Sequence, residues 1–205
     1  MISHEHKCIF IHIPRTAGTA IESWIVGKDW WLIEQETKHL IASQAKKIYA
    51  EYWDDYFKFS FVRNPWDRMV SILSHSGYYK VNYSRKIDGR RLRFKEYKEL
   101  FGYPVLIERD YRYSTYEELL RPVHQEQCVY LNILDEDIDF IGRYETLQED
   151  TQFIKEKIGI ETDFPFNKKS RESNRRKYQD YYDFFTRKEV AKMYHKDIEK
   201  FGYTY

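Results

Sequence analysis

The segment Phe10-Ile-His-Ile-Pro-Arg-Thr-Ala-Gly-Thr19 spans a change from strand-like to helix-like sequence. An apolar run from Cys8 to Ile13 predicts a buried strand that stops at Pro14. A short turn with one glycine follows, and a helical pattern begins at Ala20. The first N–H groups of a helix have no intrahelical acceptor, and the helix dipole favours negative charge there. We therefore predict that this turn binds a phosphate-like group.

The side chains of the turn favour a small anion. Arg15 supplies a fixed cation, and Thr16 and Thr19 supply hydroxyl donors. A Walker A loop needs G-x-x-x-x-G-K-[ST], whereas this turn has one glycine and no Gly-Lys pair. A single phosphate with its substituent fits such a turn better than a triphosphate. The alternative is an ordinary strand-to-helix turn of an α/β domain.

A second strand runs directly into another basic helix start. The aromatic and β-branched residues of 56–62 predict a strand, which Arg63-Asn-Pro-Trp-Asp-Arg-Met-Val-Ser71 follows. Pro65 suits the first turn of a helix. Ser71 lies eight residues, or about two helical turns, after Arg63, so both can reach one anion. Alternatively, Arg63 pairs with Asp67 and only caps the helix.

These segments resemble the sulfotransferases. P-R-T-A-G-T resembles their 5′-phosphosulfate loop, P-K-T-x-G-T, and F-V-R-N-P-W-D-R-M-V-S resembles their 3′-phosphate segment, R-[ND]-P-x-x-R-x-x-S. Residues 140–150, F-I-G-R-Y-E-T-L-Q-E-D, are similar to a motif of the carbohydrate sulfotransferases. The segment D-I-E-K-F-G-Y at 197–203 is similar to the bacterial members. The four motifs occur in order over nearly the whole chain.

The expected fold is α/β with a parallel sheet, because strand and helix patterns alternate. We expect strands at 8–13, 56–62 and 139–142, and helices at 20–26, 42–53, 65–76, 146–158 and 186–201. The resemblance implies the same class, a P-loop-like three-layer fold with a central parallel sheet flanked by helices. The length of 205 residues is most simply one domain, 1–205.

The resemblance also implies a reaction. A sulfuryl group passes from 3′-phosphoadenosine 5′-phosphosulfate (PAPS) to a hydroxyl, expected to be on a carbohydrate, by in-line transfer that leaves 3′-phosphoadenosine 5′-phosphate. No metal is required, because protein donors hold the leaving phosphate. The implied cofactor-binding residues are Arg15, Thr16, Ala17, Gly18 and Thr19 at the 5′ end, and Arg63 and Ser71 at the 3′ phosphate. A basic late loop, with Lys169, Ser170 and Arg171, is expected to close over the nucleotide.

The loop departs from the family pattern at one position. Arg15 stands where the family usually has lysine, and it is implied to contact the oxygen that bridges sulfate and phosphate. Arginine stays charged and gives directional hydrogen bonds, but it does not donate a proton to a leaving group. An arginine at this position can therefore still stabilise charge on the leaving group, but it cannot donate a proton to it.

A general base for the acceptor hydroxyl is sought among the seven histidines. A histidine is suited to this at neutral pH. His39, in K-H-L-I-A-S, resembles an H-x-T-A segment before a helix in bacterial relatives, and it is the expected base. His124 is the next candidate, in a segment similar to one near the acceptor site, with Arg121 and Gln125 expected to bind substrate. His12 and His75 are further alternatives, and Glu22 and Glu145 are outside possibilities.

Composition limits the other classes of function. A net charge of +1 argues against a general nucleic-acid binder. Two cysteines do not make a disulfide framework and favour a reducing compartment. No stretch approaches the ~20 apolar residues of a membrane span, and no signal peptide precedes the first strand. We therefore expect a cytoplasmic location.

Two other functions stay open from the sequence. A nucleotide or small-molecule kinase could use a strand–loop–helix anion site, but it would need Gly-Lys-[ST] and a magnesium-binding aspartate after a strand. A module that binds a nucleotide or a sulfated glycan without turnover would need only the anion site. Oligomeric state cannot be read from the sequence.

Overall fold

The computed structural model describes residues 1–75, 126–132, 137–166 and 177–205. Within these residues, four strands form one sheet in the order β1, β2, β3, β4. The short edge strand β1 (Ile2–Ser3) pairs antiparallel with β2 (Cys8–Ile11). Strands β2, β3 (Phe57–Val62) and β4 (Phe140–Arg143) are parallel.

The parallel register brings the three sequence motifs to one edge of the sheet. Phe10 pairs with Phe59, and Phe59 pairs with Phe140 on its other side. The carboxyl ends of parallel strands meet at the same edge, where open α/β sheets bind their ligands. The segments that begin at Pro14, Arg63 and Tyr144 all leave the sheet there.

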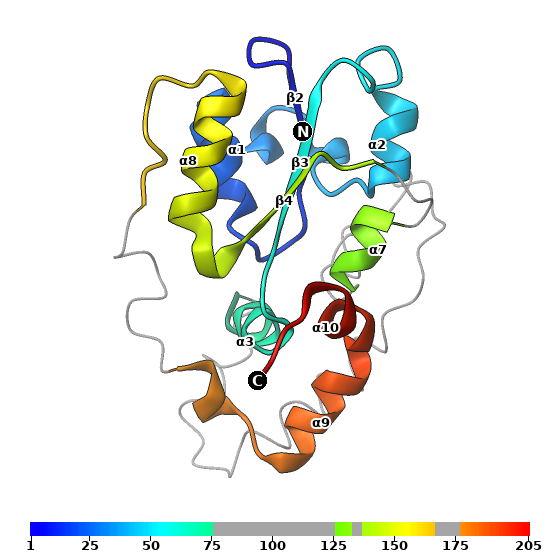
Figure 1. The fold of residues 1–205 in the computed structure, drawn as a ribbon, viewed down its shortest axis with the longest axis vertical. Coiled ribbons are helices and arrows are strands. Elements are labelled where there is room, and N and C mark those ends of the chain that lie inside the picture. The colour runs from blue at the N-terminus through cyan, green and yellow to red at the C-terminus, as the bar shows by residue number, and fades with distance from the viewer. Residues whose placement is uncertain (76–125, 133–136, 167–176) are drawn as a thin grey trace.

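Alternating residues of the strands face two separate hydrophobic layers. Phe10, Phe59 and Phe61 pack on one face with α1 (Gly18–Val26) and α8 (Leu147–Ile158). Ile9, Ile11 and Val62 pack on the other with α2 (Ala42–Ile48) and α7 (Gln127–Asn132). Figure 1 shows α1 and α8 together on one side of the sheet, and α2 and α7 on the other.

Three further helices lie beyond the carboxyl edge of the sheet (Figure 1). They are α3 (Pro65–His75), α9 (Phe184–Met193) and α10 (His195–Phe201). Single 3₁₀ turns occur at Trp30–Leu32, Gln35–Thr37, Tyr144–Thr146 and Tyr178–Tyr181.

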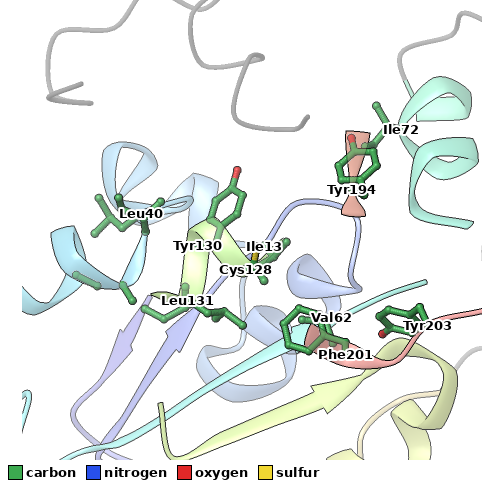
Figure 2. Close-up of a cluster of buried hydrophobic side chains, with 14 of the residues drawn as sticks. Ile13, Leu40, Val62, Ile72, Cys128, Tyr130, Leu131, Tyr194, Phe201 and Tyr203 are labelled. Atoms are coloured by element: carbon green, nitrogen blue, oxygen red, sulfur yellow. The ribbon is translucent and has the colours of Figure 1, made fainter. Parts of the chain in front are cut away.

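The second hydrophobic layer continues to the C-terminal segment. Figure 2 shows this cluster running from Leu40 past Tyr130 and Leu131 of α7 to Phe201 and Tyr203. All five side chains are buried. Burial of this apolar surface fixes the C-terminal segment against the rest of the core.

Two helices differ from their expected bounds. The helix expected at 42–53 ends at Ile48, and the chain then turns so that Trp53 enters the core. The prediction of a single helix at 186–201 is wrong, because the structure has two helices there. They are separated at Tyr194, whose φ of −116° and ψ of 31° are not helical and whose ring is buried. In both places burial of an aromatic ring overrides local helix propensity.

The expected fold class is confirmed, because a central parallel sheet with helices on both faces makes an α/β architecture. The other expected elements match within one residue, apart from β2, which ends at Ile11, and α1, which begins at Gly18, each a difference of two residues. Assignment of 1–205 to one domain stays a prediction. In the described part of the chain, no helix is long and apolar enough to cross a bilayer.

Candidate functional site

The loop between β2 and α1 holds two non-glycine residues in the left-handed region. Arg15 and Ala17 both have a φ of 71°. Such a conformation costs about 1–3 kcal/mol per residue and persists where its surroundings enforce it. Thr16 supplies part of that enforcement, since its buried Oγ1 donates to the carbonyl of Ile13 at 2.8 Å. The hydroxyl of Thr16 therefore shapes the loop from inside.

Helix α1 begins without a capping side chain. Ala17 is its N-cap, and its side chain offers no acceptor to the N–H groups of Gly18 and Thr19, whereas its carbonyl accepts from the N–H of Ala20 at 3.0 Å. Thr19 and Ala20, in the first turn, are exposed. An uncapped and accessible first turn can donate several N–H groups to an anion, and the helix dipole adds to this attraction.

Gly18 is required by a close approach from the strand. A Cβ added at this position would lie 2.1 Å from both Cδ2 and Nε2 of the His12 ring. His12 therefore packs directly beneath the first turn of α1, and only a residue without a side chain leaves room for it.

Arg63 is buried at the end of β3 and has partners on several sides. Its Nε and Nη2 each donate to Oδ2 of Asp67 at 2.8 Å. Its Nη1 donates to the carbonyl of Arg15 at 3.1 Å, and its guanidinium lies 3.7 Å from the centre of the Tyr144 ring. The Arg63–Asp67 pair is therefore formed, and Arg63 also holds the loop after β2.

Helix α3 contacts the same loop through two further residues. Nε and Nη2 of Arg15 donate to Oγ of Ser71 at 3.0 and 2.9 Å. Nε of Arg68 donates to the carbonyl of Pro14 at 3.0 Å. The two segments predicted to bind anions are therefore joined into one site.

The later motifs support the second segment. Glu145 accepts from the backbone N–H of Asn64 at 2.6 Å and from the hydroxyl of Tyr203 at 3.2 Å. The buried Asp197 accepts from the N–H groups of Gln127 and Cys128, both at 2.8 Å. The amide of Gln127 in turn bonds both backbone groups of Arg63 at 2.7 Å.

The expected base His39 lies beside His12, which directly follows β2. Its Nδ1 is 3.1 Å from the carbonyl of His12, and the two rings meet edge to face with centroids 4.4 Å apart. A carbonyl only accepts, so Nδ1 of His39 carries the proton and Nε2 keeps its lone pair. Burial, His12 and Lys38 lower the pKa of His39 well below its usual value, which keeps the ring neutral at pH 7.

A buried charge cluster lies beneath the loop. Glu22 Oε1 is 2.6 Å from Nδ1 of His12, and Oε2 is 2.8 Å from Nζ of Lys38. Lys38 also pairs with Asp29. Burial raises the pKa of Glu22, but its bonds with His12 and Lys38 outweigh this effect and lower the pKa to about 2.

The sequence missed this cluster in part. Glu22 is four residues after Gly18 and lies on the buried face of α1, which an acidic residue rarely does without a partner. An acidic residue at that position of the helix was the sequence feature that indicated a buried partner. Lys38 gave no signal, because its burial depends on segments far apart in the sequence.

Several expected residues cannot be placed. Lys169, Ser170 and Arg171, and also Arg121, His124 and Gln125, lie outside the described residues. The side chain of His75 is also not described. Among the residues that the structure does describe, no group of three or more His, Cys, Asp or Glu side chains is arranged to hold a metal ion.

Comparison with known proteins agrees with this geometry. A family described as "Sulfotransferase family" matches residues 1–204. Human carbohydrate sulfotransferase 9 is 23% identical over 97% of this chain and 48% of its own length. Zebrafish carbohydrate sulfotransferase 14 is 23% identical over 78% of this chain and 48% of its own length. The chain thus aligns with about half of each relative. No solved structure matches.

The contact between Gly18 and His12 predicts a large loss of stability in Gly18→Ala. The added Cβ forces the His12 ring away from Glu22, so overpacking and a broken buried hydrogen bond together cost about 3 kcal/mol. Urea unfolding measures this. Gly27→Ala is the matched control, because only its φ of 76° opposes a side chain there, at a cost of about 1 kcal/mol. Equal losses in the two variants would contradict the packing.

The lowered pKa of Glu22 predicts acid-sensitive folding. The unfolded chain takes up the proton near pH 4.5, the folded chain only near pH 2, so stability from Glu22 is present above pH 4.5 and lost as pH falls toward 2. The full loss is about 3 kcal/mol. Urea unfolding of wild type and Glu22→Gln from pH 7 to 3 should show their difference shrinking below pH 4.5. A constant difference over that range would show that Glu22 has an ordinary pKa.

Proposed function

The chain belongs to the sulfotransferase family, and on that premise we propose that it transfers a sulfuryl group from PAPS to a hydroxyl of a carbohydrate acceptor. One observation carries the proposal. The loop of Arg15 and the helix of Ser71 are joined by two hydrogen bonds from the guanidinium to the hydroxyl. Two anion-binding segments at this short separation suit a nucleotide with a phosphate at each end. The names of the two similar proteins support a carbohydrate acceptor.

The described residues fit such a nucleotide. The uncapped first turn of α1 offers backbone donors for the 5′-phosphate, with Arg15 beside it. Arg63 and Ser71 are the ligands proposed for the 3′-phosphate, and Arg63 is fixed for that role by Asp67 and Tyr144. A 3′-phosphate distinguishes PAPS from ATP, and the single glycine of the loop fits one phosphate group better than three.

The loop stabilises charge on the leaving group. PAPS, when bound, supplies the sulfuryl group and a phosphate as the leaving group. Fixed donors aimed at the oxygen between the two groups would stabilise the negative charge that the leaving phosphate takes there. Arg15 and the first N–H groups of α1 are the donors proposed for this task. Arg15 contributes charge and hydrogen bonds, and it does not contribute a proton.

His39 accepts the proton of the acceptor hydroxyl in this scheme. Its Nδ1–H is bonded to the carbonyl of His12, so Nε2 is the basic atom. The lowered pKa keeps Nε2 of His39 unprotonated throughout the neutral range and also weakens it as a base, so its role depends on its position beside the acceptor hydroxyl. The same proposal has two further parts. The acceptor is bound by Arg121, His124 and Gln125, and the nucleotide is covered by Lys169, Ser170 and Arg171.

A cytoplasmic location is proposed on the sequence features alone.

The two-phosphate site predicts a selective response to nucleotides. Adenosine 3′,5′-bisphosphate should raise the thermal unfolding midpoint, and at 100 times its Kd it adds about 2.7 kcal/mol of stability. ATP with Mg²⁺ should give a much smaller shift. Ser71→Ala should reduce the response to the bisphosphate, whereas Ser23→Ala, on the exposed face of α1, should not. An equal response to ATP with Mg²⁺ would favour a kinase and contradict the proposal.

The role of His39 predicts a separation between binding and turnover. His39→Asn should keep its affinity for the bisphosphate and lose about 10²–10⁴-fold in kcat with PAPS and a glycan acceptor. The exposed His195 on α10 provides the control variant, His195→Asn, which should keep full activity. Normal kcat in His39→Asn would remove His39 from this role. Bisphosphate binding without turnover of any glycan in a panel would instead indicate a binding module.

A further inference from the structure

Glu22 connects three segments through one buried carboxylate. It lies on α1, with no exposed surface. Its Oε1 meets Nδ1 of His12, at the end of the β2 segment, at 2.6 Å, and its Oε2 accepts from Nζ of Lys38 at 2.8 Å. Lys38 directly precedes His39 in the chain. The N–H of Trp30 also donates to Oε2, at the longer distance of 3.4 Å. His12 and Lys38, the two closer partners of Glu22, are therefore also neighbours of the proposed base.

The first arm of this network runs through His12. A carboxylate accepts, so Nδ1 of His12 carries the proton, and the hydrogen bond fixes the orientation of the ring. That ring stacks on Phe10 and meets the edge of the His39 ring. The carbonyl of the same residue accepts the Nδ1–H of His39 at 3.1 Å. His12 thus contacts His39 through both its side chain and its backbone.

The second arm runs through Lys38. Its ammonium has three N–H donors, and three oxygens surround it: Glu22 Oε2, Asp29 Oδ1 and, at 3.4 Å, Thr19 Oγ1. A buried ammonium needs such partners. Because Lys38 is held in place, the backbone that carries His39 is held as well. The same ammonium occupies a lone pair of the Thr19 hydroxyl, which leaves the hydroxyl proton to point away from Lys38.

We infer that Glu22 is a positioning residue that holds His39 in its Nδ1–H tautomer, with Nε2 toward the acceptor, by fixing His12 and Lys38. Glu22 itself touches neither substrate in this scheme. The catalytic use of this tautomer rests on the proposed function. The tautomer itself can be observed whether or not the protein is a sulfotransferase. The ionisable groups that face His39 are His12, Lys38 and Glu22.

A purely structural role for Glu22 makes a different prediction. A buried ion pair that loses one partner is destabilising wherever it lies. In that case Glu22→Gln lowers the stability of the whole protein and leaves the proton of His39 on Nδ1. A positioning role predicts a change at His39 itself.

The test is imidazole ¹⁵N NMR of the full chain, with the signals of His39 assigned from their absence in His39→Asn. The wild type should show one tautomer of His39, protonated on Nδ1. Glu22→Gln should show exchange between two tautomers and a changed titration of His39. Asp150→Asn is the matched control, because its carboxylate also accepts from a backbone N–H, that of Arg143 on β4, and β4 is separated by β3 from β2, the strand that leads to His12. It should leave the His39 signals unchanged.

Kinetics with PAPS provide the second readout. Glu22→Gln should lower kcat at least tenfold with a shifted pH profile, while the Kd of the bisphosphate changes less than threefold. If the wild type turns over no acceptor, the proposed function fails. The NMR comparison of the His39 tautomer in wild type and Glu22→Gln then still tests whether Glu22 positions His39. An unchanged tautomer and titration in Glu22→Gln would overturn the inference. If Glu22→Gln does not fold, Glu22→Asp replaces it, because its shorter chain cannot reach both partners and should show the same mixture.

Discussion

The parallel register of β2, β3 and β4 is the constraint on which the site depends. It pairs Phe10 with Phe59 and Phe59 with Phe140, so three distant segments leave the sheet at one edge. The register is specified by burial, since a shift of one residue would exchange the side chains that face α1 and α8 with those that face α2 and α7. The packing of two hydrophobic layers thereby fixes the distance between the two segments proposed to bind the phosphates.

At that edge, most motif residues hold one another. Arg63 is oriented by Asp67 and Tyr144, the backbone of Asn64 by Glu145, and the backbone of Arg63 by Gln127. Gln127 depends in turn on the buried Asp197. Buried polar groups of this kind are costly unless every member is satisfied, so the network specifies one arrangement. The motifs at 140–150 and 197–203 contribute through this support.

The sequence predicted those features that depend on local pattern. A continuous apolar run marked β2, aromatic and β-branched residues marked β3, and Pro65 marked the start of α3. Motif spacing predicted that Arg63 and Ser71 could reach one anion, but it did not predict the hydrogen bonds between Arg15 and Ser71. The break at Tyr194 and the early end of α2 could not be predicted, because tertiary burial of Tyr194 and Trp53 decides them. Lys38 was missed for the same reason, since its partners come from α1 and from the turn at Asp29.

A crystal structure with adenosine 3′,5′-bisphosphate bound measures most directly whether the joined segments form one nucleotide site. The 5′-phosphate should lie at the first N–H groups of α1, within hydrogen-bond distance of Gly18 and Thr19, and the 3′-phosphate should contact Arg63 or Ser71. A nucleotide that occupies only one of the two segments, or that binds away from the carboxyl edge of the sheet, would contradict the two-phosphate site.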